Sequence, residues 1–157
     1  MDGHGRWVLL AYRLPREPST PRIALWRKLK RLGAVQVLDS LVGLPFSSRN
    51  RERFEWLADE VIEAGGEASL WFAEPTSVGQ EEELVGKLKA AVAEEYRAVI
   101  DVSRAAQETP ELIQRRTLAR LRREFRRIGE RDYFPPPERE AARLAIEALA
   151  QTMEVPS

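Results

Sequence analysis

The segments that favour β-strands all lie in the first half of this 157-residue sequence. Three of them, at about 7–14, 34–44 and 68–73, are rich in β-branched, aromatic or leucine residues and are bounded by proline or glycine. From about residue 80 onward, apolar residues recur only at helical spacing. The chain is therefore expected to fold as an α+β protein in which a helical half follows a small sheet.

Two helices are expected between the strand segments, at about 20–32 and 48–64. Thr20 and Pro21 suit the N-cap and the first position of the earlier helix, and Gly33 supplies its C-terminal stop. The order strand-helix-strand-helix-strand is that of the first part of a ferredoxin-like layout, in which helices cover one face of a small sheet.

The segment 34–44 is interpreted as one strand with a break or bulge near Asp39 and Gly43, so a fourth strand is not expected. The later helices are expected at about 80–100, with a weak break at Gly86, and then at 110–129 and 137–153. We expect a single domain, residues 1–157, with an α+β portion at about 6–75 and a helical portion at about 80–153.

Charge is balanced overall but segregated along the chain. The sequence has 25 basic and 25 acidic residues, so attraction of the whole chain to nucleic acid or an anionic membrane is not predicted. The segment 22–32 nevertheless has five basic residues and no acidic one, and 111–131 has eight arginines against three glutamates. The segments 49–67 and 80–101 are acidic in sum. The folded protein should therefore be electrically polarised.

Both basic helices present their charges away from an apolar face. Leu25, Leu29 and Leu32 share one side of the first, and the spacing of Leu118, Leu121, Phe125 and Ile128 predicts the core face of the second. Arginine suits phosphate because its planar guanidinium donates paired hydrogen bonds. The candidate nucleic-acid-binding residues are Arg22, Arg27, Lys28, Lys30, Arg31, Arg116, Arg120, Arg123, Arg127 and Arg131.

Three alternatives remain open for these charges. A small oxyanion, chromate or sulfate, could be bound by Arg13, Arg16 and neighbouring arginines in the absence of nucleic acid. The arginines could instead pair with the acidic helices of the same chain. The charged helices could also form a scaffold that binds another protein.

The usual signatures of catalysis and of metal binding are missing from the sequence. Cysteine is absent, the one histidine, His4, lies in a glycine-flanked amino-terminal tail, and Asp39 is an isolated acid in a strand segment. We find no glycine-rich phosphate loop and no nucleophile elbow. We therefore expect no enzyme activity, no catalytic residue, no metal site and no cofactor.

The four tryptophans are mostly expected in the core. Trp7 and Trp71 lie in strand segments, and Trp56 lies beside Phe54 and Leu57 in a helix, where Val61 and Ile62 extend the same apolar face. Trp26 borders basic residues and could stack on a base, although packing is favoured there too.

The sequence also bears on where the protein acts. The first fifteen residues contain an apolar run of only about five residues and no cleavage site typical of a signal peptide. No segment approaches the roughly 20 apolar residues of a membrane span. We expect a soluble, unanchored, cytoplasmic protein.

The run from Trp7 to Pro45 resembles the opening of the ChrB amino-terminal domain. Its shared features are the tryptophan-led strand, Leu14-Pro15 with Pro18, the helix WRKLKRLG from Trp26 to Gly33, and Gln36 in the next strand. Later segments are similar as well, and these are Gly65-Gly66-Glu67-Ala68, Glu94-Glu95-Tyr96 and Arg131-Asp132-Tyr133-Phe134.

The resemblance implies a role in chromate resistance. ChrB proteins are chromate-responsive transcriptional regulators of operons that carry a chromate-efflux pump, so the implied partner is the DNA of such a promoter. Family members commonly continue into a carboxy-terminal domain, so the expected partners include a second copy of this chain and a separate polypeptide carrying that domain. A looser similarity links the chain to phenylacetate-degradation repressors and CRISPR-associated endoribonucleases. Tyr12-Arg13 stand where those nucleases carry an acidic metal ligand, which disfavours nuclease activity.

Overall fold

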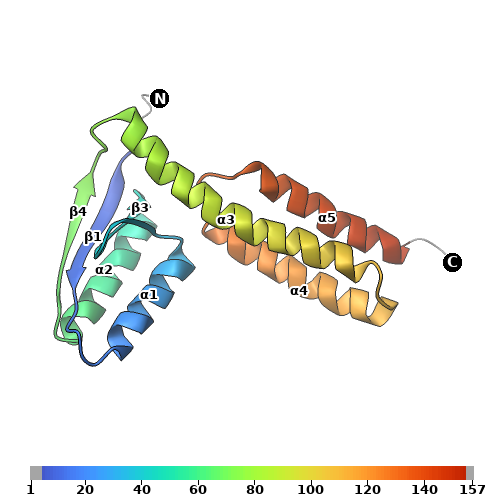
Figure 1. The fold of residues 1–157 in the computed structure, drawn as a ribbon, viewed down its shortest axis with the longest axis horizontal. Coiled ribbons are helices and arrows are strands. Elements are labelled where there is room, and N and C mark those ends of the chain that lie inside the picture. Colours follow the sequence, from blue (N-terminus) through green and yellow to red (C-terminus); the bar gives the residue numbers. More distant parts are fainter. Residues whose placement is uncertain (1–4, 155–157) are drawn as a thin grey trace. The chain divides into compact units, whose positions relative to one another are not determined.

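The computed structural model describes residues 5–154. Contacts between residues divide the chain into two compact units, Met1–Lys87 and Leu88–Ser157. Among these described residues, all strands lie in the first unit, and the regular elements of the second unit are helices (Figure 1). The expected α+β class, with strands early and helices later, is confirmed.

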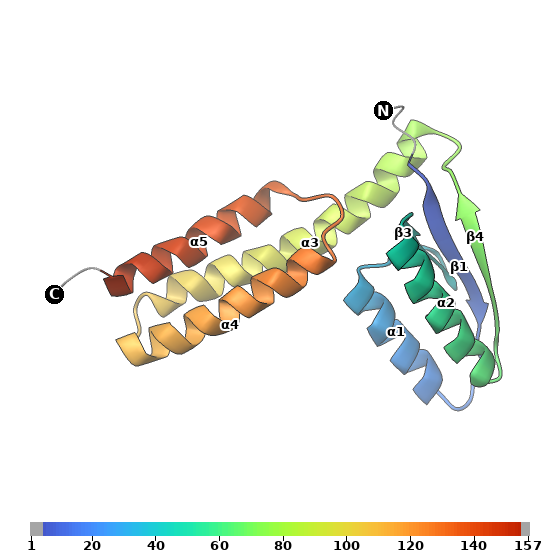
Figure 2. The ribbon, with the colours of Figure 1, turned by 180° about the vertical axis from the view of Figure 1, so that it is seen from behind.

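The first unit is built on a four-stranded antiparallel sheet with the strand order β2-β3-β1-β4. Its strands are β1 (Trp7–Arg13), β2 (Val35–Leu38), β3 (Leu41–Pro45) and β4 (Glu67–Ala73). Helix α1 (Thr20–Leu32) follows β1, and helix α2 (Ser48–Glu63) follows β3. Both helices cover the same face of the sheet, as Figure 2 shows from behind.

The segment 34–44 forms two strands, so the prediction of a single bulged strand and of no fourth strand is wrong. Strands β2 and β3 pair antiparallel around Asp39 and Ser40, and Ser40 has a φ of 63°. Two-residue hairpin turns need such left-handed backbone, which Asn-Gly or Asp-Gly signals far more strongly than Asp-Ser does. An irregularity does occur, as a shift of register between Gln36 and Leu38.

Both ends of α1 lie close to their predicted positions. Gly33 ends the helix with a φ of 75°, a left-handed conformation that glycine adopts without a steric cost. At the start, Ser19 and not Thr20 occupies the N-cap, and its side chain makes no capping hydrogen bond. Pro21 explains this in part, because proline removes one of the backbone N–H groups that a cap would accept from.

Helix α2 packs against β1 and β4 and supplies much of the core of the first unit. Phe54, Leu57 and Val61 are buried in it, as predicted. Ile62 was expected on the same face but is 56% exposed. Adjacent residues of a helix point about 100° apart, so Val61 and Ile62 cannot both face the sheet squarely.

Three of the four tryptophans are exposed, which contradicts the prediction that they pack in the core. Trp7 is buried at 2% exposure, as expected, but Trp26, Trp56 and Trp71 are 56%, 68% and 60% exposed. Trp71 lies opposite Leu9 on β1. The next residue of β4, Phe72, lies opposite Val8, which is buried. Because side chains alternate along a strand, Trp71 lies on the face away from α1 and α2.

The second unit is helical. Helix α3 (Val78–Ala106) contributes its part from Leu88 onward, together with α4 (Glu111–Glu130) and α5 (Pro137–Glu154). Phe125 packs against a buried cluster that includes Leu118, Leu121 and Ile128, so the predicted core face of α4 is confirmed. None of the helices in residues 5–154 combines the length and apolar character needed to cross a membrane.

Helix α3 passes through Gly86 without the predicted break. Leu84, Leu88 and Val92 recur at four-residue spacing and are all buried. One glycine costs a helix only about 1 kcal/mol relative to alanine, and the burial of a single leucine more than offsets that cost.

Candidate functional site

A groove with a volume of about 460 Å³ lies between α1 and α2 in the first unit. Its lining comes from the last turns of α1 and the first turns of α2. The lining residues are Lys28, Arg31, Leu32, Arg49, Glu52, Arg53, Trp56 and Leu57.

Helical periodicity explains why these side chains meet. Positions 28, 31 and 32 are three and four residues apart on α1, and 49, 53 and 57 recur every four residues on α2. The buried Leu29 and Phe54 anchor the two helices beside this stripe. The lining residues therefore follow one edge of each helix.

The first turn of α2 is fixed by its cap. The Ser47 hydroxyl accepts a hydrogen bond from the backbone N–H of Asn50 at 3.0 Å, and the Asn50 side-chain amide donates to the Pro45 carbonyl at 2.8 Å. This holds the start of α2 on the end of β3, with Arg49 between the two capping residues. The amino-terminal end of a helix favours anions, because its free N–H groups and dipole are positive.

The groove is strongly cationic. Four basic side chains and one carboxylate line it. Lys28 is neutralised, since its Nζ atom lies 2.7 Å from both carboxylate oxygens of Glu60. Within residues 5–154, no acidic side chain forms an ion pair with Arg31, Arg49 or Arg53. Three guanidinium groups are therefore left to bind an external anion.

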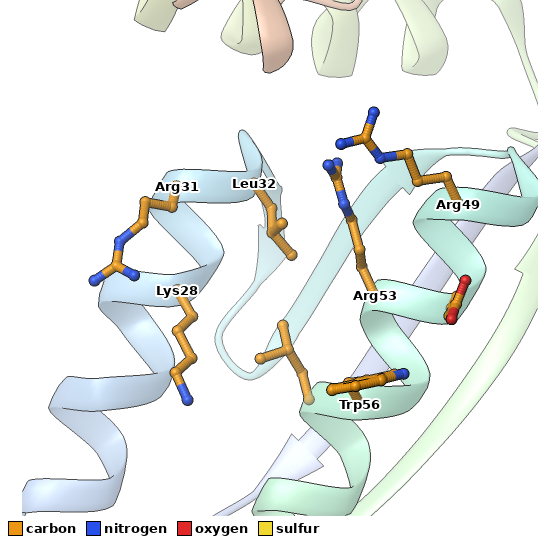
Figure 3. Close-up of a pocket in the computed structure, with 8 residues that line it drawn as sticks. Lys28, Arg31, Leu32, Arg49, Arg53 and Trp56 are labelled. Carbon is orange, nitrogen blue, oxygen red and sulfur yellow. The ribbon is translucent and has the colours of Figure 1, made fainter. Parts of the chain in front are cut away.

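Figure 3 shows how these side chains lie. Arg49 and Arg53 extend from α2 in the same direction, and the Trp56 ring is seen edge-on with one face turned toward that side. Arg31 extends from α1 toward the side that faces away from α2. The groove thus combines an exposed aromatic ring with arginine side chains.

Most of the predicted basic residues of α1 are exposed to solvent. Arg22, Arg27, Lys30 and Arg31 lie on its exposed surface. The Lys30 Nζ atom lies 4.3 Å from the centre of the Trp26 ring, a cation–π contact. Lys28 was expected to face solvent freely, but it is half-buried and paired with Glu60.

The five candidate arginines predicted at 116–131 are largely free of internal ion pairs. Four of the five are exposed and form no ion pair within the described part of the chain, namely Arg116, Arg120, Arg123 and Arg127. Arg131 is different, because it binds Glu95 through its Nε atom at 3.1 Å and its Nη2 atom at 3.0 Å. Its side chain is only 17% exposed. The alternative of pairing with an acidic helix of the same chain therefore applies to Arg131.

A hydrogen bond beside Arg131 strengthens the same junction between α3 and the turn after α4. The hydroxyl of Tyr96, which is fully buried, donates to Oδ2 of Asp132 at 2.7 Å. Burial raises the pKa of Tyr96, and the bond to Asp132 raises it further. This junction orders the second unit and leaves neither Tyr96 nor Arg131 free for a ligand.

The alternative oxyanion residues are not in the groove. Arg13 ends β1 and pairs with Glu67 of β4, and Arg16 is exposed in the loop before α1.

Asp39 lies exposed in the β2–β3 turn, where it accepts a hydrogen bond from Gln36 at 3.4 Å, and His4 lies outside the described residues. In residues 5–154, no three His, Cys, Asp or Glu side chains gather as a metal site would require.

Sequence reasoning missed the contribution of α2 to the groove. The segment 49–67 was assigned as acidic because its charges were summed over the whole segment. Its first turns in fact contain Arg49, Arg51 and Arg53 with only Glu52 against them. The four-residue spacing of Arg49 and Arg53 near a predicted helix start was the signal that could have revealed the site.

Comparison with known protein families gives a match. A family model described as "Protein ChrB, N-terminal" matches residues 22–115, which include α1 from Arg22 onward, all of α2 and every residue that lines the groove. No curated protein and no solved structure matches the chain. Since the family match spans more than half of the sequence, the chain belongs to the ChrB amino-terminal family, a family associated with chromate resistance.

Proposed function

We propose that this chain is a regulatory module of chromate resistance that binds DNA through its phosphates. The observation that carries the proposal is the groove between α1 and α2, where Arg31, Arg49 and Arg53 face solvent without an ion pair among the described residues. Family membership supplies the link to chromate resistance. The proposal makes this a binding protein and not an enzyme, acting in the cytoplasm on promoter DNA.

Phosphate is the group that best matches these side chains. Each guanidinium can donate two parallel hydrogen bonds to one phosphate, and the positive end of α2 adds to the attraction. The exposed arginines of α4 form a second cationic surface in the second unit, and we propose that it also contacts phosphates. Phosphate contacts position a protein on DNA but do not read its sequence.

We also propose a ferredoxin-like assignment for the first unit. Its element order is strand-helix-strand-strand-helix-strand, and its sheet is antiparallel with both helices on one face. That order is the one typical of the ferredoxin-like layout.

An oxyanion sensor is the second candidate function. What favours it is the same set of guanidinium groups, because a tetrahedral oxyanion presents oxygens much as a phosphate does. In this version chromate or sulfate would occupy the groove, and Arg13 and Arg16 would take no part. Chromate would then compete with DNA for the same arginines.

The test is a binding titration of the purified chain with labelled duplexes, one from its own promoter region and one unrelated, between about 50 and 200 mM salt. The double variant Arg49→Gln/Arg53→Gln is compared with Arg51→Gln/Arg143→Gln, which removes the same charge from arginines paired with glutamates on their own helices. The proposal requires that only the groove variant loses most of its affinity. Equal losses in both variants would show that net charge alone matters.

Chromate is then added to the complex at fixed salt. Release by chromate, without release by an equal ionic strength of chloride, supports the oxyanion as a second ligand of the groove. An unchanged complex argues against that second candidate.

A further inference from the structure

We infer that the groove accommodates one unstacked nucleotide, with its phosphate on Arg49 and Arg53 and its base on the ring of Trp56. The inference deepens the proposed function and rests on it, because the same arginines contact phosphate in both. It adds the form of nucleic acid that the groove recognises. A base can stack on a protein ring only when it has left its own stack, as in a single strand or a free nucleotide.

Trp56 is the residue that points to a base. The residue is 68% exposed although it forms part of the groove wall. A large aromatic ring next to positive charge is the usual platform on which proteins stack bases. Burial against a flat ligand would remove that apolar surface from water, which is favourable.

The other two exposed tryptophans lack this combination. The ring of Trp26 already carries the Lys30 ammonium at 4.3 Å. Trp71 lies on the other face of the sheet, and its indole N–H donates to the Ser69 hydroxyl at 2.9 Å. Trp56 alone among the three lines the groove with the arginines.

The spacing along α2 fits a single nucleotide. Arg53 and Trp56 are three residues apart, so their Cβ atoms are about 5–6 Å from each other on the helix surface. Their side chains therefore leave the same surface of α2 and can contact the phosphate and the base of one nucleotide. Arg49 lies one turn further toward the positive end of the helix and extends in the same direction as Arg53 (Figure 3).

The size of the groove also fits. A volume of about 460 Å³ lies within the range of about 300–1,000 Å³ that is typical of small-molecule sites. Leu32 and Leu57 contribute apolar surface between the two helices, which suits the edge of a base or sugar. A duplex can touch the charged rim but cannot place a stacked base on Trp56.

Glu52 indicates which bases fit best. It lines the groove four residues before Trp56 and three after Arg49, so it neighbours both on the helix surface. A carboxylate repels phosphate but accepts a hydrogen bond from an exocyclic amino group, as on cytosine. We expect cytosine to bind better than thymine, because thymine has a carbonyl oxygen at the position where cytosine has its amino group.

The test measures binding of labelled dC12 and dT12 single strands and of a duplex of equal length. Three variants are compared with the wild type. Trp56→Leu removes the ring but keeps apolar surface, Trp56→Phe keeps a smaller ring, and Trp71→Leu is the matched control on another face. Because Trp56 is exposed, these changes should leave the fold intact, which a melting curve checks.

Trp56→Leu should weaken binding of dC12 by about 5- to 100-fold, the range found when one stacked base loses its platform. Trp56→Phe should lose much less, and Trp71→Leu should bind as the wild type does. Duplex affinity should be the same in all of them. Competition for labelled dC12 by free CMP, but not by ribose 5-phosphate, would assign the site to a free nucleotide. Competition by unlabelled dC12 without competition by CMP would assign it to a strand.

Other results would overturn the inference. If Trp56→Leu changes no affinity while Arg49→Gln/Arg53→Gln weakens both DNA forms, the phosphate contacts of the proposed function stand and the nucleotide site does not exist. If neither Trp56 nor the two arginines matters for either form, both proposals fail. Binding of dT12 as tight as that of dC12 would refute the role given to Glu52.

Discussion

Replacing Tyr96 by phenylalanine tests whether a buried hydrogen bond joins α3 to the turn after α4. The Tyr96 hydroxyl donates to Asp132 Oδ2 at 2.7 Å, and the ring packs against Phe125 with the ring centres 5.6 Å apart. Phenylalanine keeps the ring contact and removes only the donor. Among the described residues, the other oxygen of Asp132 is already buried without a hydrogen-bond partner.

The expected loss follows from these contacts. A hydrogen bond to a charged group contributes about 1.5–3 kcal/mol, and a buried acceptor left unpaired adds a desolvation penalty. We expect Tyr96→Phe to lower the free energy of unfolding by about 2 kcal/mol at neutral pH.

The loss should depend on pH with a definite sign. Burial, and then the bond to Asp132, raise the pKa of Tyr96 in the folded state above its ordinary value of 10.0. The folded state therefore keeps the proton at a pH where the unfolded chain loses it. The stabilisation by Tyr96 is full below pH 10 and falls above it by about 1.4 kcal/mol per pH unit.

Urea unfolding followed by circular dichroism measures the free energy of unfolding of the wild type and of Tyr96→Phe at pH 8 and pH 11. Asp132→Asn and the double variant complete a mutant cycle. Other groups titrate in this range too, but they cancel in the difference between wild type and Tyr96→Phe. That difference should shrink by about 1.4 kcal/mol at pH 11. Equal stabilities at pH 8, or a difference that does not change with pH, would refute the reasoning.

Three further substitutions have distinct expected outcomes. Arg131→Gln removes the partly buried pair with Glu95 and should lower the free energy of unfolding by about 1–2 kcal/mol in urea, while the salt dependence of DNA binding stays the same. Gly66→Ala should lower the free energy of unfolding by about 1–3 kcal/mol, and with it the melting temperature, because the added Cβ would lie 2.3 Å from the Arg13 carbonyl oxygen. Gly86→Ala should raise stability by about 0.5–1 kcal/mol, since no atom beyond its chain neighbours and the backbone of its own helix lies within 4 Å of the added Cβ, and glycine is the poorer helix former. A stabilising Gly66→Ala or a destabilising Gly86→Ala would contradict the packing described.

Helices α1 and α2 were predictable because their boundaries carry local chemical signals. Pro21 and Gly33 mark α1, and the Gly65-Gly66 pair follows α2. The β2–β3 hairpin was not predictable in the same way. Asp39-Ser40 is a weak turn signal, and tertiary pairing with β1 holds β3 in place.

The functional site was predictable only in part. Arg31 was placed correctly on the exposed side of α1, from the spacing of its leucines. Arg49, Arg53 and Trp56 were missed because charge and hydrophobicity were averaged over a segment, whereas a helix separates neighbouring residues onto different faces. No local pattern could reveal that Arg131 meets Glu95, 36 residues earlier in the sequence.

The central claim, that the groove between α1 and α2 binds nucleic-acid phosphate, is tested most directly by the salt dependence of DNA affinity. On a duplex, the logarithm of the binding constant falls against the logarithm of salt concentration with a slope of about 0.9 for each phosphate that the protein neutralises. Arg49→Gln/Arg53→Gln should reduce the slope by about 0.9 to 1.8, according to whether the two arginines share one phosphate or bind two. The control Arg51→Gln/Arg143→Gln should leave it unchanged. An unchanged slope in the groove variant, with the wild type binding DNA, would contradict the claim.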